Sequence, residues 1–158
     1  LTRAMQIGRQ SLYDTFGDKW QLYLATLKRY LTQETDAQLA ALRTGPRAID
    51  GVEILLARAR AKAGEACLSV GATCEFGRRK PDVLAIQQAA ARTLRAAIVA
   101  RLREAKAEGD VTEAVDAGEG ADFLLATINA IRIAARGGAG AVQLQSVAEF
   151  ALRALRAA

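Results

Sequence analysis

The sequence predicts an all-helical protein, from its composition and from the spacing of its apolar residues. Among 158 residues there are 35 alanines and 19 leucines, whereas aromatic residues make up only 5%. Alanine and leucine favour helices, while strands are enriched in β-branched and aromatic residues. Apolar residues also recur three or four positions apart, which is the period of one helix face. A chain of this length suits a single core.

Glycine, proline and capping residues divide the chain into helices. Gly8 and Gly17 bound a short first helix, and Asp18 is a good N-cap for a long second one. Gly45-Pro46 ends one helix and begins the next, because glycine suits a helix C-terminus and proline suits the first turn of a helix. We therefore expect helices over 9–16, 19–42, 47–63, 66–76, 82–108, 121–136 and 142–157.

Three further features of these elements carry expectations. The middle of the second helix, residues 33–36, is polar all round, and residues 111–120 are acidic and loop-like. The last two helices, 121–136 and 142–157, are apolar and rich in alanine, so a monomer would leave apolar surface exposed. A self-complementary homodimer interface through these two helices is the natural way to cover it.

The absence of histidine limits the chemistry available. Without it, Ser-His and Cys-His hydrolases are excluded, together with the commonest ligand of catalytic zinc. No paired arrangement of Glu, Lys or Tyr stands out, and two cysteines alone make a poor metal site. We therefore expect no enzyme, no cofactor and no metal.

Charge is unevenly distributed along the chain. The net charge is +5, and residues 1–80 hold 13 Lys and Arg against 8 Asp and Glu, while residues 81–158 hold 9 against 9. An anionic partner is therefore expected to dock on the first half. A merely basic surface that aids solubility is the alternative.

The cysteines and the hydropathy favour a cytoplasmic protein. Cys67 and Cys74 lie seven residues apart in a helical stretch, about 10 Å along the axis, which is too far for a disulfide. This fits a reducing compartment. No window approaches the roughly 18 apolar residues of a membrane span, and no secretory leader is present, so we expect no membrane partner.

Residues 1–22 read as a short helix, a turn, a second helix and the start of a third. This is the pattern of a helix-turn-helix motif that begins partway through its first helix. The N-terminal residues of such a second helix reach base edges in the major groove of double-stranded DNA. Arg9 and Gln10 suit guanine and adenine edges, with Thr15 about one turn further along. The side chains expected to bind phosphates are those of Ser11, Tyr13 and Lys19.

The run from Ile7 to Leu22 resembles the signature of the TetR/AcrR family of repressors. The matching positions are Leu12, Tyr13, Phe16, Lys19 and Leu22. Two positions depart from it: Gln6 stands where the family prefers glycine in the turn, and Gly8 where it often has serine. The chain also opens in mid-helix without an initiator methionine, so we expect the family's first helix and much of its second to precede Leu1.

The resemblance implies an all-α, TetR-type architecture in which a long helix joins a DNA-binding head to a helical body. Residues 1–42 would be a partial helix-turn-helix domain with its linking helix, and residues 43–158 the ligand-binding and dimerisation domain. It implies a homodimeric transcriptional repressor on a palindromic DNA operator, released by a small-molecule inducer. The alternative from another class is a helical ligand-binding or scaffold protein that does not bind DNA.

The inducer is expected between the linking helix and helices 47–63, 66–76, 82–108 and 121–136. Asn129 and Glu75 are the more informative candidates, because polar groups in apolar stretches need partners and can orient a ligand. For Glu75, pairing with Arg78 or Arg79 is an equal alternative. The candidate ligand-binding residues are Tyr23, Leu27, Tyr30, Leu55, Leu56, Cys67, Val70, Cys74, Glu75, Ile86, Phe123 and Asn129.

Cys67 adds a further possibility. The run from Ala66 to Glu75 is similar to a Gly-Cys-Leu pattern with a downstream glutamate, found in one TetR subgroup that includes repressors responding to electrophiles and oxidants. A thiol near a helix N-terminus gains thiolate character, and Arg60 and Lys62 are close in sequence. A redox- or electrophile-responsive repressor is therefore an alternative, against that of a buried, inert thiol.

Overall fold

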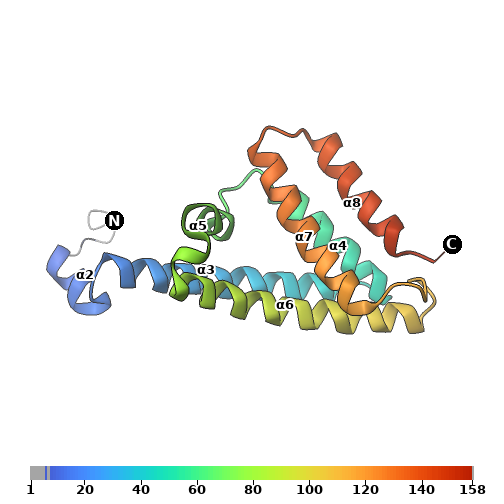
Figure 1. The fold of residues 1–158 in the computed structure, drawn as a ribbon, viewed down its shortest axis with the longest axis horizontal. Coiled ribbons are helices and arrows are strands. Elements are labelled where there is room, and N and C mark those ends of the chain that lie inside the picture. Colours follow the sequence, from blue (N-terminus) through green and yellow to red (C-terminus); the bar gives the residue numbers. More distant parts are fainter. Residues whose placement is uncertain (1–5, 7, 158) are drawn as a thin grey trace.

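The structure, a computed structural model, describes residue 6 and residues 8–157 and is all-helical, as predicted. Two long helices, α3 (Lys19–Leu42) and α6 (Pro81–Ala107), lie side by side along the long axis of the molecule (Figure 1). The short helix α2 (Arg9–Phe16) lies at one end and contacts α3. The remaining elements are α4 (Ala48–Ala61), α5 (Leu68–Phe76), the 3-10 turn η1 (Gly77–Arg79), α7 (Ala117–Arg136) and α8 (Ala141–Leu155).

Helix boundaries follow the capping residues. The Asp18 carboxylate accepts a hydrogen bond from the Gln21 amide at 2.8 Å, which starts α3 where the sequence predicts it. The predicted loop over 111–120 is too long, however. Asp116 accepts from the amides of Gly118 and Glu119 and so begins α7 at Ala117, four residues before the expected start.

The turn before α2 contains an unusual backbone conformation. Gln6 has a φ of +52°, in the left-handed region that favours glycine. This is the position at which the TetR/AcrR signature prefers glycine. Residues 1–5 and residue 7, on which part of the expected helix-turn-helix falls, lie outside the described residues.

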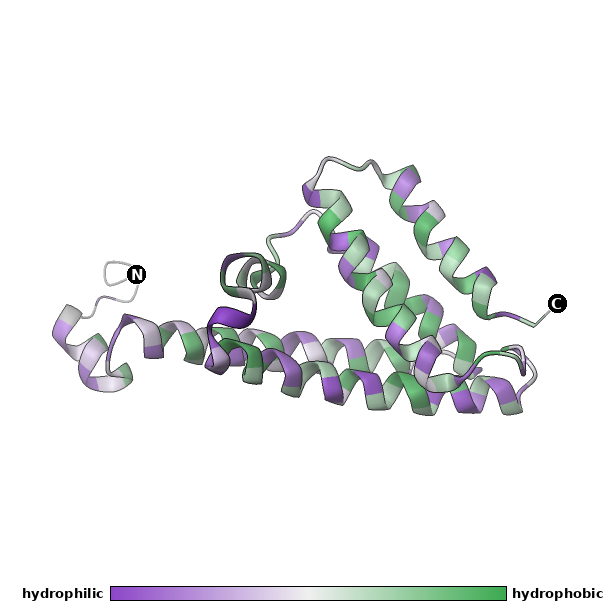
Figure 2. Ribbon diagram, viewed as in Figure 1, coloured by the Kyte–Doolittle hydropathy of each residue, from purple (hydrophilic) through white to green (hydrophobic). Residues whose placement is uncertain are grey.

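The core is divided in two. The larger part fills the space between α4, α6, α7 and α8, and hydrophobic residues predominate along α4 and α7 in Figure 2. The smaller part forms where α3, α5 and α6 meet, from Leu27, Leu31, Ala72 and Val83. Helix α3 therefore packs against the body over most of its length, whereas α2 contacts α3 beyond these cores.

Helix α4 starts very close to the end of α3. A Cβ atom at Gly51 would lie 2.1 Å from the carbonyl oxygen of Leu42, so only glycine fits this crossing. None of the helices in residues 8–157 has the length and apolarity needed to cross a bilayer.

Candidate functional site

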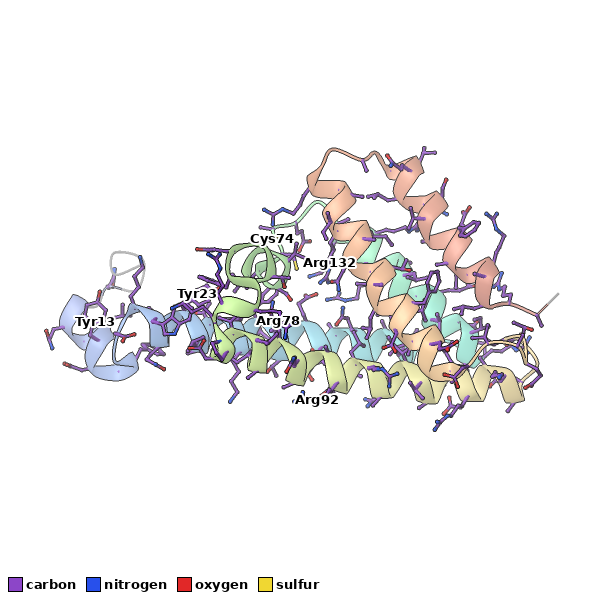
Figure 3. The ribbon with its side chains drawn as sticks, in the orientation of Figure 1. Tyr13, Tyr23, Cys74, Arg78, Arg92 and Arg132 are labelled. Carbon is purple, nitrogen blue, oxygen red and sulfur yellow. The ribbon has the colours of Figure 1, made fainter. Side chains whose placement is uncertain are left out.

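Helix α2 presents a polar outer face and a packed inner face. Leu12 is buried and Phe16 half-buried, both on the inner face that the sequence predicts. Tyr13 is 37% exposed and lies at the end of the molecule remote from α8 (Figure 3). The other predicted DNA-contacting residues with described side chains are also exposed, namely Gln10, Ser11, Thr15 and Lys19. The side chain of Arg9 lies outside the described residues.

Local hydrogen bonds orient two of these side chains. The Gln10 amide nitrogen donates to the Asp14 carboxylate at 2.9 Å, and the Thr15 hydroxyl donates to the Ser11 carbonyl at 2.9 Å. A glutamine amide has a second N–H and a carbonyl oxygen, so Gln10 keeps a donor and an acceptor for a base edge. Thr15, in contrast, commits its only hydroxyl hydrogen to the helix backbone.

An aromatic cluster joins the start of α3 to the body. Trp20, Tyr23 and Phe76 contact one another with ring centroids 5.3 to 5.5 Å apart. The Trp20 indole N–H donates to the Asp82 carboxylate at 2.7 Å, and this bond lowers the pKa of Asp82. Tyr23, predicted to line the inducer pocket, belongs to this cluster instead, and its burial raises its pKa. The cluster fixes the first turns of α3 against α5 and α6.

Two small cavities, each partly open to solvent, lie in the body. The larger, about 100 Å³, is lined by α3, α5, α6 and α7, broadly where the inducer is expected. The smaller, about 60 Å³, lies beside it under the loop between α4 and α5. The same three side chains, Tyr30, Glu34 and Arg132, line both of them.

A group of charged side chains, which we call the ionic cluster, separates these cavities: Glu34, Arg58, Lys62 and Arg132. One Glu34 oxygen, Oε1, accepts from Arg58 at 3.0 Å and from Lys62 at 3.4 Å. The other, Oε2, accepts from Arg132 at 3.2 Å. Arg132 is only 9% exposed, so this pairing takes place in the interior. The cluster links α3 to both α4 and α7.

Cys67 lies at the edge of the ionic cluster. Its thiol is buried at the N-cap of α5, and Nη1 of Arg132 lies 3.5 Å from its sulfur. Burial, followed by the neighbouring Cys67, raises the pKa of the Tyr30 phenol to about 12. Cys74 is exposed, and both cysteines are free, as their spacing predicts.

The structure distributes the predicted ligand-binding residues over several environments. Tyr30, Cys67 and Asn129 line one or both cavities, although Asn129 is exposed at the rim and not buried among its apolar neighbours. Ile86 faces a separate open groove of about 480 Å³ between α3 and α6. The residues buried in the cores are Leu27, Leu55, Leu56 and Val70, and those that are exposed are Cys74, Glu75 and Phe123.

The alternative expected for Glu75, pairing with Arg78 or Arg79, is replaced by a contact to its backbone. Arg79 donates to the backbone carbonyl of Glu75, at the end of α5, and not to its carboxylate. This contact satisfies a carbonyl at the helix C-terminus, where cations are favourable.

Sequence reasoning missed the ionic cluster. Residues 33–36 read as polar all round, yet Thr35 is buried and Glu34 is turned into the body. One signal could have found the cluster: Arg132 interrupts an apolar stretch between Ile131 and Ile133, and a buried cation requires a partner.

Helices α7 and α8 leave large hydrophobic side chains exposed. Val142 is 82% exposed, Phe150 65%, Ile133 55% and Phe123 41%. All four belong to the two helices for which the sequence predicts a dimer interface.

Comparisons with known proteins agree with this architecture. The family model described as tetracyclin repressor-like, C-terminal domain, matches residues 50–149. The helices follow the order of a TetR-type transcriptional regulator, with an exposed short helix ahead of a long linking helix. The chain belongs to the TetR family of transcriptional regulators.

Several solved structures are similar over nearly the whole chain. A cysteine-substituted TetR family regulator CifR, in complex with operator DNA, is 29% identical, with a TM-score of 0.81 over 97% of this chain and 83% of that one. Reduced NemR from E. coli is 17% identical, with a TM-score of 0.82 over 99% and 83%. A TetR regulator from Chloroflexus aurantiacus is 20% identical, with a TM-score of 0.83 over 97% and 80%. No curated protein sequence matched the chain.

Proposed function

We propose that this protein is a homodimeric repressor that binds a palindromic DNA operator and is released by a small molecule bound in its body. The observation that carries the proposal is the outer face of α2 and the first turn of α3. There Gln10, Ser11, Tyr13 and Lys19 are exposed together, while Leu12 anchors the helix. Such a face supplies base-edge and phosphate contacts side by side. A cytoplasmic regulator that binds DNA requires such an exposed polar face.

The exposed side chains of α7 and α8 support the homodimer. Large apolar side chains exposed on two packed helices are explained by a partner that covers them, and a two-fold axis lets the same helices cover each other. Two heads related by that axis would read half-sites about 34–36 Å apart, or a multiple of this.

The position of the cavities supports release by a small molecule. They adjoin α3, which carries α2 at its other end, and they also contact α7, which belongs to the proposed dimer interface. A ligand there acts on DNA binding only if it favours a separation of the two heads that does not fit the operator.

Operator binding by the full-length protein to DNA upstream of its own gene tests the proposal by fluorescence anisotropy. Lys19→Ala and Tyr13→Ala should weaken binding to all sequences similarly, and Lys19→Ala should also reduce the salt dependence. Arg9→Ala and Gln10→Ala should relax preference at particular base pairs. Unchanged binding in all four variants would overturn the assignment of this face to DNA, and no binding by the wild type would favour the helical scaffold instead.

Release by thiol modification is a second candidate, favoured by one contact. Nη1 of Arg132 lies 3.5 Å from the Cys67 sulfur, and reactive cysteines are commonly found beside cations. If Cys67 is the sensor, mild oxidant should release the wild type from DNA but not the Cys67→Ser variant, with Cys74→Ser as a control. Equal release of all three proteins, or of none, would remove this candidate.

A further inference from the structure

We propose that the effector of this regulator is a small carboxylate that binds in the cavity between α3, α5, α6 and α7 and replaces Glu34 on Arg132. This inference rests on the proposed release by a ligand in the body and names the chemistry of that ligand. It also assigns Glu34 the role of an internal anion that occupies the site when the ligand is absent.

The first support is the balance of charge. Three cations, Arg58, Lys62 and Arg132, converge on the single carboxylate of Glu34. Among the residues that the structure describes, the only other acid paired with them is Glu65, which contacts Lys62 at 3.5 Å and is 66% exposed. Among the described residues the cluster therefore carries an excess of positive charge. An added anion stabilises such a cluster, whereas an added cation is repelled.

The second support is the unused hydrogen-bonding capacity of Arg132. Its Nη1 faces Cys67 and its Nη2 faces Glu34, which leaves further N–H donors of a planar guanidinium at the walls of both cavities. A guanidinium binds carboxylates and phosphates in a bidentate geometry, and the apolar side chains that line the larger cavity favour a carboxylate with a hydrocarbon tail.

The third support is the cavity itself. Its volume of about 100 Å³ suits a carboxylate with a short tail. The tail would lie against the apolar side chains of Leu94, Leu125 and Ile128, while the carboxylate would lie at Arg132, on the wall shared with the smaller cavity. The site therefore offers a cation to the charged end of the ligand and apolar side chains to its hydrocarbon end.

The exchange has a mechanical consequence. Glu34 belongs to α3, and its bonds to Arg58 and Arg132 tie this helix to α4 and α7. When an external carboxylate takes Arg132, Glu34 keeps its pairs with Arg58 and Lys62, and the added negative charge offsets the excess positive charge of the cluster. Helix α3 nevertheless loses one of its connections to the body, and it is the helix that bears the DNA-reading α2.

Isothermal titration calorimetry of the full-length protein without DNA tests the inference. Butyrate is the probe, and butyramide, which has nearly the same shape but no charge, is its control at matched ionic strength. The wild type should bind butyrate at least tenfold more tightly than butyramide. Because no DNA is present, the result is independent of whether the protein binds an operator.

Two variants should move the affinity in opposite directions. Glu34→Gln removes the internal competitor, so butyrate should bind at least tenfold more tightly than to the wild type. Arg132→Met removes the guanidinium, so the preference for butyrate over butyramide should disappear. A merely structural role for the cluster would weaken binding in both variants.

Equal binding of butyrate and butyramide by Glu34→Gln would overturn the proposal. So would an affinity for butyrate that does not rise in this variant. Should Arg132→Met not fold, Glu34→Gln alone decides, because its expected gain in affinity cannot arise from loss of structure. If butyrate binds as expected but operator binding is absent, the inference about the site holds and the proposed repressor function is wrong.

Discussion

Glu34 is the residue whose surroundings depart most from its place in the sequence. It lies in a polar stretch of a long helix, where solvent exposure is the ordinary outcome, and its side chain is instead only 14% exposed and contacts three cations. Periodicity cannot predict this, because the cations come from α4 and α7 and meet Glu34 only in the folded protein. Arg132, which contacts Glu34, is the better signal of the ionic cluster in the sequence, because it interrupts an apolar stretch.

Replacing Glu34 by alanine should lower the free energy of unfolding by about 3 kcal/mol, because it leaves buried Arg132 without its carboxylate. Urea unfolding measures the change. Glu65→Ala is the matched control, since Glu65 pairs with the same Lys62 at the surface and should change stability by no more than about 0.5 kcal/mol. Equal effects of the two substitutions would show that the ionic cluster is not buried.

Tyr30 makes stability depend on alkaline pH. Burial raises its pKa from 10.0 to about 12, so the folded protein holds the phenolic proton more tightly than the unfolded chain. Its contribution to stability is fully present below pH 10 and is lost as the pH rises through about 12. Unfolding experiments across this window should show a shallower decline for Tyr30→Phe than for the wild type. An identical decline in both proteins would contradict this assignment.

At the scale of elements, most helix boundaries are predictable and packing is not. The bounds of α2 and α3 agree with the sequence because Gly8, Gly17 and Asp18 act locally. The start of α7 was missed, although Asp116 is a good N-cap, because the acidic, glycine-containing stretch reads as a loop. The exposed face of α2 was likewise predictable from residues 9–19, whereas the cavity residues depend on how four helices pack.

The crossing of α3 and α4 gives a test at this scale. Gly51→Ala would place a methyl group against the Leu42 backbone, which cannot move as a side chain can, so stability should fall by about 2 to 3 kcal/mol. Gly71→Ala in α5 is the control, because no atom lies within 4 Å of its new Cβ. It should be neutral or stabilise by up to about 1 kcal/mol through helix propensity. Thermal unfolding of both variants measures these effects, and a stable Gly51→Ala protein would contradict the close crossing.

At the scale of the whole molecule, α7 lines the cavities on one side, and together with α8 it forms the proposed interface with the partner protomer. Phe150→Glu places a charge on the apolar face of α8 and should weaken self-association at least tenfold. Sedimentation equilibrium measures this change. Gln88→Glu adds the same charge on the exposed surface of α6 and should leave association unchanged. Matching behaviour of the two variants would place the dimer interface elsewhere.

The molecule consists of a short helix at one end that we propose reads DNA, a long helix that bears it, and a body to which the long helix is joined by apolar packing and by the ionic cluster. The central claim is that two such molecules bind one operator through their α2 helices. Sedimentation velocity of the full-length protein with a labelled duplex from its own upstream region tests it most directly. We expect two protomers on each duplex and a weaker complex in Lys19→Ala. A single protomer on each duplex, or a complex unaffected by Lys19→Ala, would contradict it.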